Sequence, residues 1–119
     1  MDEEIRLEIA AIKEWAKANL IGKDFESPIG IISMNMTGIK EAINQPHKFK
    51  KEKTSAIYTI PALLSDSVHV ESADDEKGNI KKYHYLQITL NNEFSYIVIK
   101  ETWQGKKNFY SIVDRLKGK

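Results

Sequence analysis

The sequence contains no cysteine. This absence excludes a disulfide framework, a thiolate metal site and a cysteine nucleophile, and it leaves the redox compartment undetermined. The sequence also lacks any apolar run near the roughly 20 residues of a membrane-spanning helix, so we expect no membrane partner. The N-terminus is acidic from its second residue, unlike a secretory signal peptide. We therefore expect a cytoplasmic protein, or one delivered into a target cytoplasm if it is a toxin domain.

Net charge is also nearly absent, at +1 from 18 basic and 17 acidic side chains, and arginine is scarce. Binding to nucleic acid would therefore have to rest on a local patch of charge. The sequence has no P-loop, GxGxxG, GxSxG or zinc signature, and its histidines are not at metal-ligand spacing. The acidic run Asp74, Asp75 and Glu76 lacks the pattern of a calcium loop. We expect neither a metal nor another cofactor.

Helical patterns dominate the first half of the 119 residues. Apolar residues recur at spacings of three and four in residues 2–20, and again from Met36. Asn35 or Thr37 is the expected N-cap of the second helix, and Pro46 ends it. A third helix is expected to start near Thr59 or Ile60, because proline is tolerated only in the first turn.

Strand patterns dominate the second half. Residues 83–90 alternate between two faces, Asn91 and Asn92 suit a two-residue hairpin turn, and residues 94–101 and 109–114 supply two more strands. Shorter strands are expected at 29–33 and from Val68, separated from the meander by an acidic loop. The sequence therefore predicts an α+β fold, with N-terminal helices packed on a four-stranded antiparallel sheet that ends in a three-strand meander. We expect a single domain over 1–119, with an N-terminal helix in 1–24 and a core in 29–115.

One stretch, Thr37–Lys53, combines a helix end, a histidine and dense positive charge. His47 follows Pro46 and precedes four lysines that lie close together in the sequence: Lys48, Lys50, Lys51 and Lys53. An imidazole titrates near neutral pH, and lysines could hold an RNA backbone and stabilise charge on phosphorus. The same pattern is typical of a solvated loop with an incidental histidine. Phe49 fits either a base-stacking ring or a core anchor.

The other histidines have simpler interpretations. His84 shares an alternating face with Leu86 and Ile88, so we expect a satisfied histidine at the edge of the core. His69 lies between two valines and is expected to be exposed. Neither competes with His47 as a candidate general base.

The last strand supplies the remaining candidates. By alternation Tyr110 and Ser111 should point to opposite faces, so only one of them is expected to face a surface groove. Arg115, just past the strand, could contact phosphate. Aromatic residues on a sheet face can stack on bases, although cross-strand packing is the commoner role.

The order of these elements resembles the barnase/EndoU/colicin/RelE-like nuclease superfamily, and more narrowly its phage- or polyvalent-protein-associated members. The resemblance covers about residues 29–115, carried by IGIISMNMTGIKEAINQPHK, AIYTIPALLSDS, KKYHYLQITL and IVIKETWQGKKNFYSIVD.

The resemblance implies a metal-independent endoribonuclease domain that cleaves RNA by attack of the 2′-hydroxyl. It implies His47 as general acid or base, with Lys50, Tyr110 and Ser111 as the other catalytic residues. Phosphate contacts would come from four basic residues: Lys48, Lys51, Lys53 and Arg115. Implied partners are RNA, an immunity protein or a parent polyprotein. The chain departs from the pattern in lacking an obvious second catalytic histidine, which leaves open an inactive module that binds nucleic acid or protein.

Overall fold

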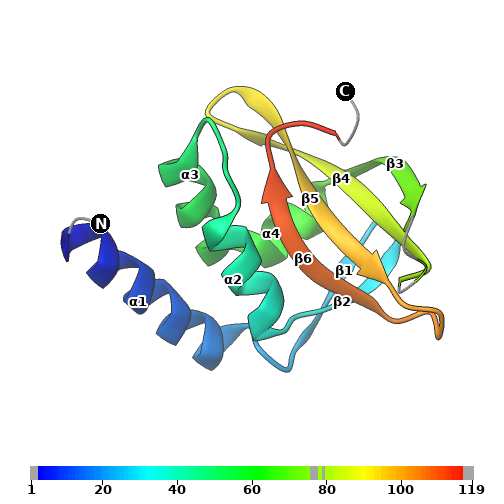
Figure 1. Cartoon of the computed structure of the whole chain (residues 1–119), viewed down its shortest axis with the longest axis horizontal. Helices are drawn as coiled ribbons and strands as arrows, with labels where there is room; N and C mark the ends of the chain where they lie inside the picture. The colour runs from blue at the N-terminus through cyan, green and yellow to red at the C-terminus, as the bar shows by residue number, and fades with distance from the viewer. Residues whose placement is uncertain (1–2, 76–77, 79, 117–119) are drawn as a thin grey trace.

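The computed structural model describes residues 3–75, 78 and 80–116. The helices are α1 (Glu3–Asn19), α2 (Met36–Asn44), α3 (Lys50–Ser55), the 3-10 helix η1 (Ala56–Thr59) and α4 (Ile60–Asp66). The strands are β1 (Asp24–Ser27), β2 (Gly30–Ser33), β3 (Val68–Asp74), β4 (Lys82–Leu90), β5 (Glu93–Glu101) and β6 (Lys107–Val113). The helices gather on one side of a curved sheet, which confirms the predicted α+β class (Figure 1).

The sheet has six strands within the described residues, in the order β1-β2-β6-β5-β4-β3. The predicted count of four strands was therefore wrong, because the polar residues of β1 pair with β2 and β3 extends the meander. The predicted meander of β4, β5 and β6 is confirmed, since each of its pairs is antiparallel. The final strand β6 also pairs with β2, in parallel, through Ser33 and Asn108. The C-terminal strand thus joins the N-terminal hairpin to the meander.

The hairpin between β4 and β5 depends on two asparagines with positive φ. Asn91 and Asn92 have φ angles of 51° and 65°, a left-handed conformation that asparagine tolerates better than most residues. The two-residue turn fixes the register from Leu90↔Glu93 to Lys82↔Glu101. This register assigns each residue of the two strands to one face of the sheet.

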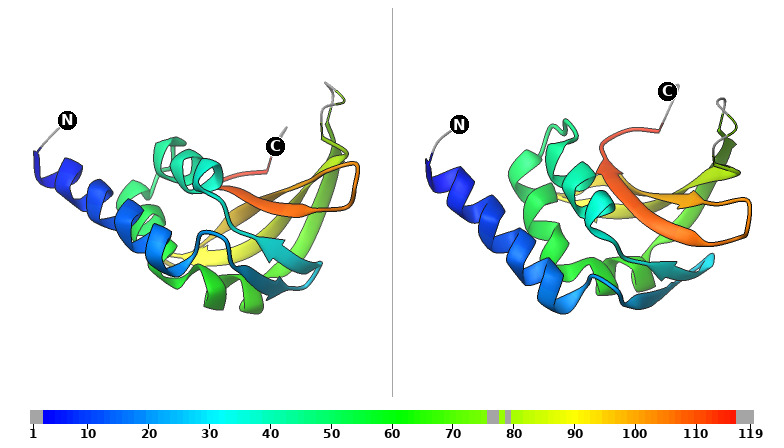
Figure 2. Two further views of the ribbon diagram at one scale, coloured as in Figure 1. Left: turned by 90° about the horizontal axis from the view of Figure 1, so that it is seen from below. Right: turned by 60° about the horizontal axis from the view of Figure 1, so that its bottom comes forward.

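The helices cover one face of the sheet and form the core with it (Figure 2). Cross-strand triplets on that face include Leu86, Ile97 and Ile112, each with no exposed surface. Helix α2 packs against β6 so closely that a Cβ on Gly38 would lie 2.1 Å from the carbonyl oxygen of Phe109. Only glycine fits at this crossing.

The ends of the helices follow the sequence signals. Asn35 is the N-cap of α2, and its side chain accepts a hydrogen bond from the backbone N–H of Gly38 over 2.9 Å. The helix ends before Pro46, and α4 starts at Ile60, both as predicted. The basic segment after His47 was predicted as a loop, but residues from Lys50 onward form α3.

Candidate functional site

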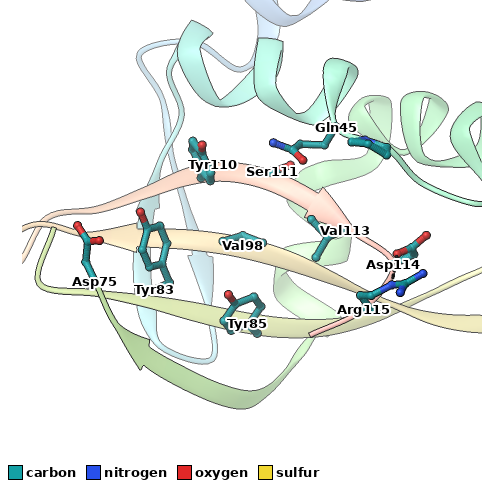
Figure 3. Close-up of a pocket in the computed structure, with 11 residues that line it drawn as sticks. Gln45, Asp75, Tyr83, Tyr85, Val98, Tyr110, Ser111, Val113, Asp114 and Arg115 are labelled. Carbon is teal, nitrogen blue, oxygen red and sulfur yellow. Dashed lines mark hydrogen bonds and ion pairs between the residues drawn. The ribbon is translucent and has the colours of Figure 1, made fainter. Parts of the chain in front are cut away.

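A pocket of about 610 Å³ lies against the face of the sheet opposite the core (Figure 3). Its floor is built by cross-strand neighbours on β4, β5 and β6, because Tyr85 pairs with Val98 and Val98 pairs with Ser111. Tyr83 and Tyr110 extend the floor along the strands. Polar groups stand at its rim, namely Gln45, Asp75, Asp114 and Arg115. The pocket therefore combines an aromatic floor with donors and acceptors at its edge.

A β-bulge in β6 brings both candidate hydroxyls of the last strand into this pocket. Val98 pairs with Ser111 while the next residue, Ile99, pairs with Phe109, so Tyr110 is an extra residue without a direct partner. Such a bulge interrupts the strict alternation of side chains. Tyr110 and Ser111 consequently both line the pocket. The prediction that they point to opposite faces was wrong for this reason.

Ser111 presents a buried polar atom that lacks a partner. Its side chain is 1% exposed, and among the residues that the structure describes its Oγ has no hydrogen-bond partner. A buried hydroxyl without a partner costs free energy, on the order of 1–3 kcal/mol. Ser111 lines the pocket, but its Oγ is itself shielded from solvent, so a bound polar group would remove that cost only after a neighbouring side chain moves.

The tyrosines form an aromatic surface with a cation beside it. The ring centroids of Tyr83 and Tyr110 are 6.3 Å apart, and Lys100 Nζ lies 3.7 Å from the centroid of the Tyr110 ring. Burial raises the pKa of Tyr83, Tyr85 and Tyr110. Their hydroxyls therefore stay protonated at neutral pH and can both donate and accept hydrogen bonds.

The loop that carries His47 lies beside this pocket. Gln45 and Pro46 line the wall, and the backbone N–H of Lys48 donates to Asp114 Oδ2 over 2.9 Å. That backbone hydrogen bond lowers the pKa of Asp114, and His47 adds to the effect. The loop after Pro46 thus contacts the end of β6, next to the pocket.

The ring of His47 does not line the pocket. Its Nε2 is 3.0 Å from Ser95 Oγ, and Ser95 is a fully buried residue on the core face. Its Nδ1 accepts a hydrogen bond from the backbone N–H of Phe49 over 2.8 Å. Partial burial lowers the pKa of His47 below 6.5. Both ring nitrogens are therefore occupied within the fold.

The four lysines after His47 do not converge on one site. The Nζ of Lys53, a fully buried residue, donates to the carbonyl oxygen of Gln45, and Lys50 Nζ donates to the same oxygen over 3.0 Å. Both lysines thus satisfy a carbonyl at the end of α2. Lys48 pairs with Glu93 at 3.1 Å. A phosphate contact by Lys53 would require its present hydrogen bond to break.

Lys51 belongs to a different part of the surface. Together with Lys50 it borders a groove of about 790 Å³ between α3 and the start of α1, where Ile5 and Leu7 are exposed. The pocket on the sheet is called the tyrosine pocket below, after Tyr83, Tyr85 and Tyr110. Of the residues predicted as catalytic or RNA-binding, only Tyr110, Ser111 and Arg115 line it.

His84 is the buried histidine that its alternating pattern predicted. It is 7% exposed, and both ring nitrogens are within 2.7 Å of a partner, Ser72 on β3 and Glu101 on β5. His69 is exposed, as predicted, and also contacts the Ser72 hydroxyl, over 2.8 Å. No spacing in the sequence signals this cluster, because its members come from three strands.

Within the described residues, no three side chains of the metal-binding types lie close enough together to hold an ion. No helix in the described part of the chain has the length and apolar character to cross a membrane. Residue Glu76 of the acidic run lies outside the described residues.

Comparison with known proteins places the chain in a family. No curated protein and no solved structure matches it. The family model described as large polyvalent protein-associated domain 3 matches residues 4–110. That match covers most of the 119 residues, and the chain therefore belongs to the large polyvalent protein-associated domain 3 family.

Proposed function

We propose that this domain is a binding module of a polyvalent protein, and that its tyrosine pocket takes a base of single-stranded RNA. The family match confirms the polyvalent-protein part of the resemblance and leaves the nuclease part a prediction. The observation that carries the proposal is the floor of three tyrosines with polar side chains at its edge. A nucleobase offers both a flat face for the tyrosines and polar edge atoms for the groups at the rim.

The charges around the pocket suit a nucleotide better than a wholly apolar ligand. Arg115, at the rim, is exposed and could meet a phosphate, and Lys100 lies over the Tyr110 ring. Asp75 and Asp114 at the rim can accept hydrogen bonds from amino groups of a base. A pocket of about 610 Å³ is within the usual range for small ligands, roughly 300–1,000 Å³.

Fluorescence anisotropy with labelled single-stranded RNA oligomers tests the proposal. Tyr110→Ala should weaken binding about 5- to 150-fold, since stacking contributes about 1–3 kcal/mol per base. Tyr58→Ala is the matched control, because Tyr58 packs on Trp15 on the helical side of the molecule. No saturable binding by the unmodified protein, or equal losses in the two variants, would rule out the pocket as the RNA site.

Cleavage of the bound RNA is the second candidate function. It is favoured by the position of the His47 loop beside the pocket, and by the lowered pKa of His47, which leaves the imidazole neutral at physiological pH. A neutral imidazole can act as a general base. His47 would have to release Ser95 and turn toward Tyr110, Ser111 and Lys50. A toxin-like enzyme of this kind would also call for an immunity protein as a partner.

Incubation of the protein with transfer RNA in EDTA separates the two functions. Cleavage that disappears in His47→Ala would establish a metal-independent ribonuclease. Binding without cleavage would leave the domain an inactive RNA-binding module, and binding to neither RNA nor another nucleic acid would favour a module that binds protein.

A further inference from the structure

We propose that Ser72, His84 and Glu101 form a nucleophilic triad that transfers the acyl group of carboxylic esters. The triad lies on the core face of the sheet and shares no residue with the tyrosine pocket. The inference is therefore independent of the function proposed for that pocket.

The register of three neighbouring strands brings the side chains together. Ser72 on β3 is the direct partner of His84 on β4, and His84 is the partner of Ile99 on β5. Glu101 lies two residues beyond Ile99, so its side chain emerges on the same face. The distance from Ser72 Oγ to His84 Nδ1 is 2.7 Å, and that from His84 Nε2 to Glu101 Oε1 is 2.7 Å.

The two hydrogen-bond partners of His84 determine which of its ring nitrogens donates and which accepts. The hydrogen bond from His84 lowers the pKa of Glu101, so this carboxylate is ionised at neutral pH and can only accept. In its neutral form His84 therefore carries its proton on Nε2, which leaves the lone pair of Nδ1 to accept from the Ser72 hydroxyl. This is the serine-to-imidazole-to-carboxylate order of a nucleophilic triad, with the two ring nitrogens exchanged relative to the Ser-His-Asp triad.

Burial distinguishes the three groups in the way that a reactive serine requires. The side chains of His84 and Glu101 are 9% and 12% exposed, whereas Ser72 is an exposed residue. Ser72 also lies on the edge strand β3, which pairs only with β4 in the described sheet. An edge strand directs half of its backbone N–H groups away from the sheet, where they can donate to a substrate.

His69 adds a donor next to the nucleophile. Its Nε2 is 2.8 Å from Ser72 Oγ and 3.1 Å from the backbone oxygen of Glu71. Because the Ser72 proton points to His84, a proton on His69 Nε2 is directed at the free lone pairs of the serine oxygen. That contact holds Oγ in place for attack. Lys81 Nζ is 3.6 Å from Glu101 Oε2 and supports the charge of the carboxylate.

The reaction balances with water as the only co-reactant. Ser72 Oγ forms a bond to the ester carbonyl carbon while its proton passes to His84 Nδ1, and the ionised Glu101 stabilises the imidazolium. Breaking the carbon–oxygen bond to the alcohol returns that proton to the leaving oxygen. Water then attacks the acyl-serine, His84 takes its proton and gives it back to Ser72 Oγ, and a carboxylic acid is released.

A fluorophosphonate probe tests the nucleophile directly. Its phosphorus forms a bond to an activated serine oxygen with loss of fluoride, and intact-mass and peptide spectra locate the label. The unmodified full chain should be labelled at Ser72 and should hydrolyse p-nitrophenyl acetate. Ser72→Ala should lose both, whereas Ser65→Ala, a change at an exposed serine in the last turn of α4, should lose neither.

A second variant separates reactivity from folding. His84→Gln should slow labelling about 100-fold or more, the usual contribution of a general base. Its far-UV circular dichroism and urea midpoint report whether it remains folded. Absence of label on the folded unmodified protein, or labelling at Ser72 that is unchanged in folded His84→Gln, overturns the proposal and leaves the three residues a structural network.

Discussion

His47 and His84 are both at least partly buried, and each forms a hydrogen bond with a serine. The histidine is the donor in one pair and the acceptor in the other. At His47, Nδ1 accepts from a backbone N–H, so the proton lies on Nε2 and is donated to Ser95. At His84, Nε2 donates to Glu101, so Nδ1 accepts from Ser72. The residue types are the same in both pairs, and the third partner decides which serine is activated.

The two serines also differ in their access to solvent. Ser95 has no exposed surface, whereas Ser72 is exposed on an edge strand. A buried serine that accepts from an imidazole stabilises the fold, and an exposed serine that donates to one is poised for reaction. The difference predicts that changes near His47 alter stability and that changes near His84 alter reactivity.

The largest expected effect is on the reactivity of Ser72. Glu101→Gln removes the charge that stabilises the His84 imidazolium, and the rate of fluorophosphonate labelling should fall about 100-fold or more. Glu93→Gln, at the other end of the same strand, is the matched control and should label at the original rate. Equal rates in the two variants would mean that the carboxylate has no part in the reaction.

The next largest effect is the loss in the free energy of unfolding when each serine is replaced by alanine. Ser95→Ala leaves the Nε2 proton of His47 without an acceptor in a buried site, so the free energy of unfolding should fall by about 1–3 kcal/mol. Ser72→Ala likewise removes the donor to Nδ1 of the buried His84, but water can take the place of the exposed Ser72 hydroxyl, so this loss should be smaller, less than about 1 kcal/mol. Urea denaturation measures both. A larger loss in Ser72→Ala would reverse the comparison.

A smaller effect is the pH dependence that His47 contributes. Burial lowers the pKa of His47 below 6.5, with Lys53 and Lys48 adding to the effect and Asp114 opposing it. The unfolded chain therefore binds the proton first as pH falls, and the folded state loses stability as pH drops through 6.5.

Urea midpoints at pH 7.5 and 5.5 measure this dependence. His47→Gln should show a flatter change between the two values, since glutamine keeps a donor for Ser95 and does not titrate. His69→Gln is the control, and it should retain the slope of the original protein. An unchanged slope in His47→Gln would show that this histidine does not titrate differently on folding.

A second pH dependence, in the alkaline range, is expected at Lys53. Burial lowers its pKa from 10.5 to about 8, with Lys50 adding to the effect. The unfolded chain binds more protons between these values, so stability should rise as pH increases from 8 toward 9.5. Lys53→Met should remove that rise, and the exposed neighbour offers the control Lys51→Met. A rise that persists in Lys53→Met would assign it to another group.

Local signals in the sequence predicted the ends of elements well. Pro46 ends α2, Pro61 marks the start of α4, and two asparagines turn the chain between β4 and β5. Each of these signals acts through the φ and ψ angles of its own residues, so no distant part of the chain is needed to interpret it. The burial of His84 at the edge of the core was also predicted, because alternation is local too.

The candidate site depended on contacts that sequence spacing does not encode. The bulge at Tyr110 exists only in the pairing of β6 with β5, and it overturned the alternation of Tyr110 and Ser111. Lys53 appeared to be one more surface lysine, but tertiary packing buries it at the end of α2. The partners of His84 lie 12 and 17 residues away, on other strands.

The position of β6 between β2 and β5 has a consequence for the synthesis of this protein. The hairpin of β1 and β2 leaves the ribosome before β6, and β2 gains its second neighbour only when Asn108 is available to pair with Ser33. Helix α2 likewise lacks its closest contact until Phe109 is made. The emerging chain therefore carries an unpaired strand edge until β6 has been made, a state that exposes it to aggregation. Folding is completed only when the last strand enters the middle of the sheet.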